Sequence, residues 1–576
     1  MKRQAGRPPM RRRQAKKKKG FGRLVLLAGL IILAISLWKG IQEWLPNQQF
    51  ANQDDGISQR ISWNDQLTAY GAKGSGKELL IPAGAIEDYM STYVWAEQQS
   101  NLVIVTNDSN TAVIPVDGNK GIWNGQTHTW SGTANIIDGE GYVAASILEE
   151  LGVTRSKQFK VDGKVELLAP GTSYDQGRIK LQKRADDKVA LREEPDKHAL
   201  MVAELFGDTE LKLWDAEGEW FKATDQVSGA VGYVQRSEVE QSGAVQVPER
   251  KSMELPDFVK QNIPINLTWE AVYTRNPKTS SLPDMPGVNV ISPTWFSLED
   301  GQGNVKSKAD ADLVDWAHAE GKQVWALYSN SFDPDLTREA LSTYERRSRT
   351  TQQLLHYAEQ YRFDGLNIDF ENVNVNEREV LTQWVRELTP LLRQEGLVVS
   401  IDVTGKSSSG NWSMFLDRAN LAKSVDYMMV MAYDEHWAAS PKAGSVASLP
   451  WTEQTMQRIM DEDQVPASKL VLGMPLYMRI WTETEQNGKT EVKSKAVGMT
   501  GIKEWLQEHK VTPEFMEDVG QNYAEVTVDG VRMRVWIEDE TSIQARVDMA
   551  KRMGLAGVAT WARTFGDESL WSMLHY

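Results

Sequence analysis

Residues 364–371 read Asp-Gly-Leu-Asn-Ile-Asp-Phe-Glu, a stretch in which apolar and polar residues alternate. Successive side chains of a β-strand point to opposite faces, so Asn367, Asp369 and Glu371 are expected to share one face. The apolar residues between them would face the other way. Burying a carboxyl group costs free energy, so an inward-facing pair is expected mainly where it has a function. At a spacing of ~7 Å, two of them perturb each other's pKa. The pattern therefore indicates a strand that ends in a functional carboxyl pair, Asp369 and Glu371.

Seven further apolar runs accompany this strand between residues 256 and 576, and segments of helical periodicity separate them. The eight runs are 265–272, 288–293, 324–328, 365–371, 397–403, 427–433, 470–475 and 557–561. Between the fourth and fifth runs, 377–393 has apolar residues at helical spacing. Eight strands alternating with helices are typical of the α/β class and of the (β/α)8 or TIM barrel. The region 256–576 is longer than is typical of this fold, and the extra length lies at 478–536, where we predict an added hairpin.

Aromatic and acidic residues follow several of the other predicted strands. In a TIM barrel, the functional site lies at the C-terminal ends of the strands. The candidates at those ends are Trp295, Tyr433, Asp434, Trp437, Tyr477 and Trp561. Aromatic faces can stack on the C–H groups of a sugar ring, while carboxylates and phenols hydrogen-bond hydroxyl groups. A carboxyl pair ringed by such residues predicts a sugar-binding site.

The carboxyl-bearing stretch resembles the D-G-x-D-x-D-x-E motif of glycoside hydrolase family 18, the chitinase-like barrels. Residues 431–434 (Met-Ala-Tyr-Asp), residues 473–477 (Gly-Met-Pro-Leu-Tyr) and Trp561 match the other marks of that family in order. The resemblance covers 256–576. Within the family, the chain is most similar to the branch that carries wall-binding modules and acts in spore-cortex or cell-wall turnover.

The resemblance implies a retaining mechanism in which the substrate's own acetamido group is the nucleophile. It implies Glu371 as the general acid and base, Asp369 as the group that orients the acetamide, and Tyr433 as its hydrogen-bond donor. The substrate-binding residues would be Asp434, Trp561, Tyr477, Asn367, Trp295 and Trp437. The expected substrate is an N-acetylglucosamine-containing polysaccharide, either peptidoglycan, spore cortex or chitin. No metal and no other cofactor is expected.

One position departs from the motif, because its second aspartate is Asn367 in this chain. That position supports the middle aspartate and is not the acid, so activity is compatible with the change. An amide here removes a buried charge that could share a proton with Asp369. We therefore expect a shifted pH profile.

The amino terminus combines a basic segment with an apolar one. Residues 1–23 hold eleven Lys and Arg and no acid, whereas the rest of the chain has 79 acids against 53 bases. Residues 24–41 are almost uncharged and predict a single-pass transmembrane anchor. The positive-inside rule then predicts a cytoplasmic basic tail and an extracytoplasmic body, with 42–65 as a linker. A cleaved signal peptide is the competing reading. The basic residues indicate topology, and no nucleic-acid partner is expected.

Two β-rich domains are predicted between the linker and the barrel. Residues 66–180 resemble the copper amine oxidase N-terminal-like domain of bacterial surface proteins, which implies no copper chemistry. A faint internal repeat relates 80–89 to 142–151, each a short helix-like segment followed by strands. Residues 185–242 hold short alternating strands and resemble the bacterial SH3 domain. This resemblance implies the cell wall as a partner.

The chain contains no cysteine, which excludes a disulfide scaffold, a cysteine nucleophile and thiolate metal sites. The seven histidines show no HExxH spacing, which argues against a metal-dependent hydrolase. Two non-enzymatic functions stay open: a carbohydrate-binding chitinase-like protein without catalysis, and a wall or sporulation scaffold. Retention of Glu371 favours the enzyme, since degenerate members of the resembled family usually change that residue.

Overall fold

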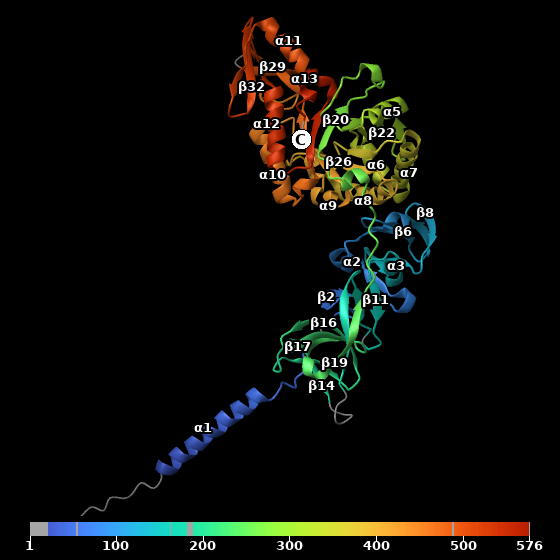
Figure 1. The fold of residues 1–576 in the computed structure, drawn as a ribbon, viewed down its shortest axis with the longest axis vertical. Coiled ribbons are helices and arrows are strands. Elements are labelled where there is room, and N and C mark those ends of the chain that lie inside the picture. The colour runs from blue at the N-terminus through green and yellow to red at the C-terminus, as the bar shows by residue number, and fades with distance from the viewer. Residues whose placement is uncertain (1–20, 53–55, 162, 181–187, 487–488, 575–576) are drawn as a thin grey trace, which may run out of the picture. The chain divides into compact units, whose positions relative to one another are not determined.

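The computed structural model describes residues 21–52, 56–161, 163–180, 188–486 and 489–574 (Figure 1). The chain divides into two compact units. Unit 1 comprises residues 1–72 and 156–249, and unit 2 comprises residues 73–155 and 250–576. Most of the predicted basic tail, residues 1–20, lies outside the described residues.

Helix α1 (Phe21–Trp44) contains the predicted anchor segment. Its large apolar side chains between Leu26 and Trp38 are exposed. Among the residues that the structure describes, no helix combines the length and the apolar character needed to cross a bilayer.

Unit 1 is built from two sheets. The smaller has the order β11-β12-β1-β2, in which β1 pairs in parallel with β12. These strands are β1 (Arg60–Trp63), β2 (Gln66–Gly71), β11 (Arg155–Gln158) and β12 (Val165–Leu168). The predicted linker 42–65 therefore ends inside a strand. The predicted domain 66–180 is divided between the two units, since residues 66–72 and 156–180 belong to unit 1 and residues 73–155 to unit 2. In unit 1, β1 pairs with β12, which follows it by about a hundred residues.

The larger sheet of unit 1 has seven strands in the order β15-β14-β18-β17-β16-β13-β19. They are β13 (Ser173–Ile179), β14 (Val189–Arg192), β15 (Met201–Leu205), β16 (Glu210–Glu217), β17 (Trp220–Asp225), β18 (Val231–Gln235) and β19 (Val239–Gln246). Apolar residues from alternate positions, such as Leu211 and Leu213, fill its core. The short strands predicted within 185–242 are confirmed, whereas the SH3 resemblance stays a prediction.

Residues 73–155 of unit 2 contain the two halves of the predicted repeat. Strand β3 (Leu80–Pro82) leads into helix α2 (Ala83–Tyr89), and strand β10 (Glu140–Ala144) leads into helix α3 (Ala145–Glu150). The two halves meet directly, because β3 pairs antiparallel with β10. A five-stranded sheet lies between them in sequence: β4 (Tyr93–Glu97), β5 (Leu102–Thr106), β6 (Thr111–Pro115), β7 (Lys120–Trp123) and β8 (Gln126–Thr129).

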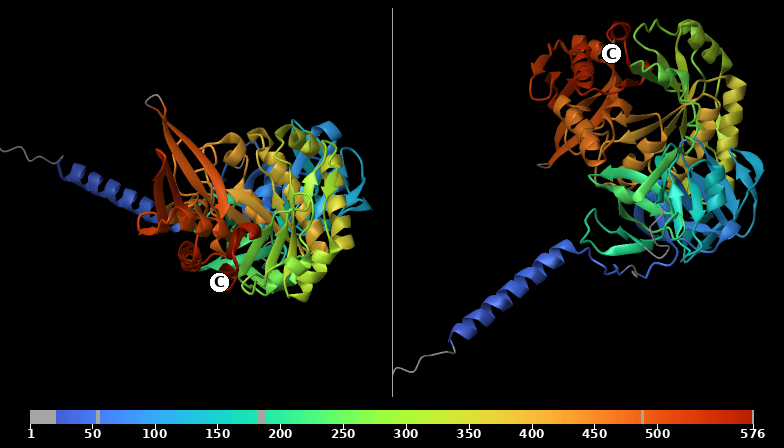
Figure 2. Two further views of the ribbon diagram at one scale, coloured as in Figure 1. Left: turned by 90° about the horizontal axis from the view of Figure 1, so that it is seen from above. Right: turned by 60° about the horizontal axis from the view of Figure 1, so that its bottom comes forward.

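The rest of unit 2 confirms the predicted barrel, which is the green-to-red part of the ribbon (Figure 2). Its eight parallel strands are β20 (Ile265–Glu270), β21 (Val290–Pro293), β24 (Gln323–Ser329), β25 (Gly365–Asp369), β26 (Val398–Thr404), β27 (Tyr427–Met431), β28 (Leu470–Pro475) and β34 (Gly557–Trp561). The ring closes because β20 pairs with both β21 and β34. All eight fall on the predicted apolar runs.

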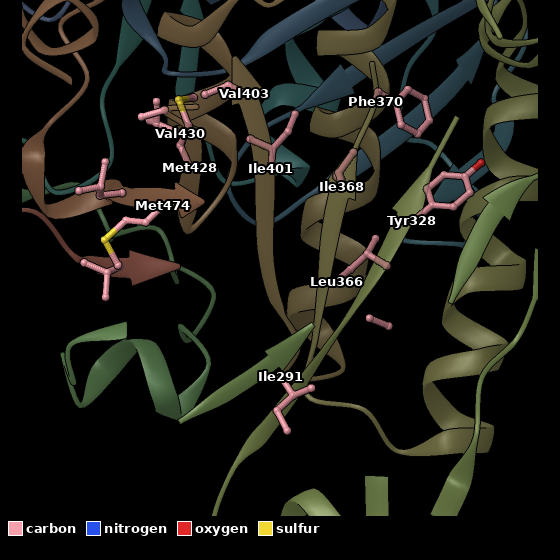
Figure 3. Packing of buried hydrophobic residues seen from close by; sticks show 14 of the residues in the cluster. Ile291, Tyr328, Leu366, Ile368, Phe370, Ile401, Val403, Met428, Val430 and Met474 are labelled. Carbon is pink, nitrogen blue, oxygen red and sulfur yellow. The ribbon is translucent and has the colours of Figure 1, made fainter. Parts of the chain in front are cut away.

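Alternation along β25 separates the two cores of the barrel as predicted. Leu366, Ile368 and Phe370 point outward into the large cluster that includes the apolar face of the surrounding helices (Figure 3). Helix α8 (Arg378–Gln394) confirms the helix predicted at 377–393. Its Trp384 stacks on Phe370, with ring centroids 5.2 Å apart. The polar residues of β25 are thereby left to face the interior.

The predicted insertion before the last strand is a five-stranded antiparallel sheet. Its order is β30-β29-β33-β32-β31. The strands are β29 (Tyr477–Gln486), β30 (Lys489–Gly498), β31 (Glu514–Met516), β32 (Gln521–Val528) and β33 (Val531–Ile537). The β32–β33 pair is the predicted hairpin.

A buried charge cluster joins residues 73–155 to the barrel within unit 2. The side chain of Arg347, on α7 (Tyr344–Tyr361), is fully buried. It forms ion pairs with Glu97 of β4 at 2.9 Å and with Glu387 of α8 at 2.8 Å. Burial alone would lower the pKa of Arg347, but the two carboxylates raise it above its usual value. The guanidinium therefore stays charged and holds the two segments together.

Candidate active site

The carboxyl pair lies at the C-terminal end of β25. Asp369 is the last residue of this strand and is buried, and Glu371 follows two residues later and is half-buried. The side chain of Asn330 holds the backbone at Glu371. It accepts from the Glu371 N–H at 3.0 Å and donates to the Glu371 carbonyl at 2.7 Å. Asn330 was not among the predicted site residues.

Burial perturbs both carboxyl groups strongly. It raises the pKa of Asp369 to about 7. Burial, followed by the charges of Asp369 and Asp434, raises the pKa of Glu371 to about 9. Glu371 is therefore protonated at neutral pH, which is the state that a general acid needs.

Two tyrosines and an aspartate lie beside the pair at the ends of β27 and β28. Tyr477 donates a hydrogen bond from its hydroxyl to Asp434 Oδ1 at 2.6 Å. Tyr433 packs edge-on against Tyr477, with ring centroids 6.4 Å apart. Burial raises the pKa of the Tyr433 hydroxyl well above its usual value, so the hydroxyl keeps its proton. These three predicted residues lie together.

A cleft of about 780 Å³ runs from Glu371 across the ends of β26 and β27. It is lined by Glu371, Thr404, Gly405, Lys406, Ser407, Ser409, Trp412, Met431, Tyr433, Asp434, Trp437, Trp451, Gln454, Thr455 and Arg458. The predicted Trp437 is 54% exposed. Trp412 and Trp451 add further aromatic surface that the sequence analysis did not assign to the site, although Trp412 follows the fifth predicted strand.

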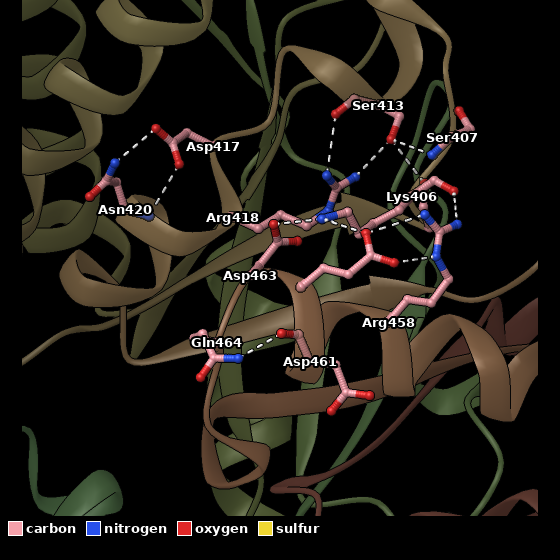
Figure 4. A network of polar contacts seen from close by, with 12 residues as sticks. Lys406, Ser407, Ser413, Asp417, Arg418, Asn420, Arg458, Asp461, Asp463 and Gln464 are labelled. Atoms are coloured by element: carbon pink, nitrogen blue, oxygen red, sulfur yellow. Dashed lines mark hydrogen bonds and ion pairs between the residues drawn. The ribbon is translucent and has the colours of Figure 1, made fainter.

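Ion pairs fix the wall of this cleft beside β26 (Figure 4). Lys406 pairs with Asp463 at 2.7 Å and with Glu462 at 3.2 Å. Arg458 pairs with Glu462 at 2.8 Å. The two cations thus stand at the cleft in fixed positions.

The structure corrects two of the predicted substrate contacts. Trp295 is fully buried, and its indole N–H donates to Asn276 Oδ1 at 2.6 Å, so it does not line the cleft. Asn367 is also fully buried, and its amide is hydrogen-bonded to Trp269, Ser292, Ser400 and Asp402, so it does not line the cleft. Trp561 is half-buried and packs on Trp269, with ring centroids 5.9 Å apart.

Comparisons with known proteins agree with this geometry. Residues 300–566 match the model of glycosyl hydrolases family 18. The chain is 27% identical over 305 residues to the "Uncharacterized glycosylase YvbX" of Bacillus subtilis, covering 50% of this chain and 84% of that protein. It is 25% identical over 252 residues to the "Cortical fragment-lytic enzyme" of Bacillus subtilis, covering 43% of this chain and 57% of that protein.

Two solved structures are also similar. One is the Bacillus cereus spore cortex-lytic enzyme SleL, with a TM-score of 0.49, 20% identity, and coverage of 58% of this chain and 77% of that one. The other is a chitinase from Chromobacterium violaceum, with a TM-score of 0.48, 20% identity, and coverage of 54% and 98%.

A closed (β/α)8 barrel with a carboxyl pair at the C-terminal ends of its strands is the arrangement that many glycoside hydrolases use. Residues 300–566 of this unit match the model of glycosyl hydrolases family 18, the family that the motif resembles. The chain is a glycoside hydrolase, and the proteins similar to it include a cortical fragment-lytic enzyme and a class V chitinase. The copper amine oxidase-like resemblance stays a prediction.

Proposed function

We propose that the chain hydrolyses β-linked N-acetylglucosamine polymers with retention, using the substrate's acetamido group as the nucleophile. The observation that carries this proposal is the raised pKa of Glu371 at about 9, beside buried Asp369 and at the edge of the cleft. Family 18 is an exception to the two-carboxylate scheme of most glycosidases.

The proposed reaction uses the site residues in sequence. Glu371 gives its proton to the glycosidic oxygen as the bond to the anomeric carbon breaks. The acetamide oxygen attacks that carbon and forms an oxazolinium ion. Asp369 stabilises the positive nitrogen of this ion. Glu371, now ionised, removes a proton from the water that opens the ring.

Neighbouring side chains would orient the sugar. The protonated hydroxyl of Tyr433 can donate a hydrogen bond to the acetamide oxygen. Asp434, held by Tyr477, can accept from sugar hydroxyl groups. The half-buried ring of Trp561 offers a flat apolar floor. The exposed rings of Trp412 and Trp437, which line the cleft, offer further aromatic surface.

We propose a cell-wall polymer, peptidoglycan or spore cortex, or chitin as the substrate. The name of the cortical fragment-lytic relative supports the first class. A wall-binding role of residues 185–242 would hold the barrel on an insoluble substrate. The purified chain is expected to release products from one of these polymers. Mass spectrometry should show N-acetylglucosamine at the new reducing end. Failure to cleave either polymer, with binding retained, would favour a carbohydrate-binding protein.

We also propose that residues 24–41 anchor the chain in the cell membrane, with the body on the extracytoplasmic side. The exposed apolar side chains of α1 support this proposal, since surfaces of that kind are stable only against lipid or protein. Fractionation of cells tests it: the chain should stay in the membrane fraction after high-salt washing. Recovery in the soluble fraction would overturn the proposal.

A further inference from the structure

A third carboxyl group lies beside the pair and has no part in the mechanism above. Asp402 lies on β26, and it is 2% exposed. Strands β25 and β26 pair in parallel, with Ile368 opposite Ile401. Asp369 and Asp402, the next residues on each strand, are therefore neighbours about 5 Å apart between adjacent strands. Their side chains share the inner face of the barrel.

The amide of Asn367 is fixed toward Asp402. Its Oδ1 accepts from the indole N–H of Trp269 at 2.8 Å and from Ser292 Oγ at 3.2 Å. An indole N–H can only donate, so the oxygen of the amide must face Trp269. The NH₂ group therefore points the other way and donates to Asp402 Oδ1 at 2.7 Å. This bond occupies one oxygen of Asp402 and leaves the other oxygen available.

Asp369 has a carboxyl oxygen that requires a hydrogen-bond donor. Its Oδ1 is buried and has no hydrogen-bond partner among the described residues. A buried carboxylate oxygen without a donor costs free energy. The groups that face Asp402 are Asp369 and Glu371 from the end of β25 and Tyr433 from the end of β27. Burial and the charge of Asp369 raise the pKa of Asp402 well above its usual value, so Asp402 has a proton to donate.

We propose that Asp402 is a positioning residue that shares its proton with Asp369, in the place of the aspartate that Asn367 replaces in the motif. The carboxyl group beside Asp369 lies on the neighbouring strand in this chain, and it accepts a hydrogen bond from the amide of Asn367. Donation from Asp402 holds Asp369 ionised and oriented toward the acetamide. This inference rests on the proposed function, because it assigns a role in that reaction.

Three variants test the proposal by the pH dependence of kcat/KM on chito-oligosaccharides. Asp402→Ala removes the donor, so we expect kcat to fall about 10–100-fold with KM within ~3-fold. The acidic limb of its pH profile of kcat/KM should shift to higher pH by about one unit, because Asp369 ionises less readily without a donor. Asp402→Asn keeps a donor, so its acidic limb should stay near that of the unmodified chain. The double variant Asn367→Asp/Asp402→Asn places the carboxyl group at the motif position. The acidic limb of its pH profile should also stay near that of the unmodified chain.

The control is Ser400→Ala, since Ser400 is on the same strand and contacts Asn367 at 3.2 Å but has no acidic proton. Its acidic limb should not move. An Asp402→Ala variant with an unchanged limb and unchanged kcat would overturn the proposal. So would a double variant no better than Asp402→Ala.

A readout without turnover separates this proposal from the proposed function. Infrared spectroscopy of the full chain at pH 6–7 should show, besides the band of protonated Glu371, a second protonated-carboxyl band that Asp402→Asn removes and Glu371→Gln does not. If the unmodified chain hydrolyses no polymer but the band behaves in this way, the proposed function fails and the proton on Asp402 stands. If the band is absent, the shared proton is disproved.

Discussion

Replacing Glu371 with glutamine should lower kcat on N-acetylglucosamine polymers by about 10³-fold or more, with little change in KM. The amide has nearly the shape of the carboxyl group but can neither give a proton to the glycosidic oxygen nor take one from water. Acid–base catalysis by one group contributes ~10²–10⁴-fold. Initial rates on soluble chito-oligosaccharides would measure the effect. Full activity in this variant would disprove the mechanism.

Thermal melts of the same variant show whether it folds. They also test the raised pKa of Glu371, because the effect of the substitution on stability should depend on pH. The folded chain raises the pKa of Glu371 from 4.5 to about 9, so it binds this proton more tightly than the unfolded chain does. The stabilisation that this proton contributes to the folded state is fully present below about pH 4.5 and is lost as the pH rises toward 9. Glu371→Gln should therefore raise the melting temperature by about 2 °C or more at pH 8.5 and change it little at pH 5.

Replacing Arg347 with methionine should reduce the free energy of unfolding of unit 2 by about 3–5 kcal/mol. This change leaves Glu97 and Glu387 buried without their shared cation, although the apolar volume is nearly kept. Urea unfolding followed by tryptophan fluorescence would measure the loss.

Arg349→Met is the matched control for that variant. Arg349 lies on the same helix, is 40% exposed and pairs with Glu345 one turn away. Exposed pairs of this kind contribute ~0.3–0.5 kcal/mol, so the control should unfold almost like the unmodified chain. Equal effects of the two substitutions would show that the buried cluster is not what stabilises unit 2. Adding Glu387→Gln to Arg347→Met should recover part of the loss.

The barrel could be predicted because its evidence is local. Each strand is a short apolar run, and the alternation in 364–371 alone places Asp369 and Glu371 on the inner face. Position at the end of a strand does not determine whether a side chain is exposed, which is why the predicted substrate contact of Trp295 is wrong. Trp295 follows a barrel strand, as Trp437 does, but its indole turns inward to bond Asn276.

Other features depend on contacts between distant residues. Asp402 is the one charged residue of β26, and only the register with β25 shows that it neighbours Asp369. The association of residues 73–155 with the barrel depends on pairs such as Glu97 and Arg347. No pattern within either segment indicates that partner. Asn330 likewise looks like an ordinary loop residue until its two bonds to the Glu371 backbone are seen.

The distance along the chain between these partners affects folding during synthesis. Glu97 accepts from the backbone of Tyr344, 247 residues later. At the ribosome's rate of ~5–20 residues per second, the partner of Glu97 follows about 12–50 s after it. During that time Glu97, the one charged residue of β4, has neither Tyr344 nor Arg347 as a partner. The nascent chain therefore has a defined interval in which a chaperone can bind this segment, and the interval closes when α7 and α8 have been made.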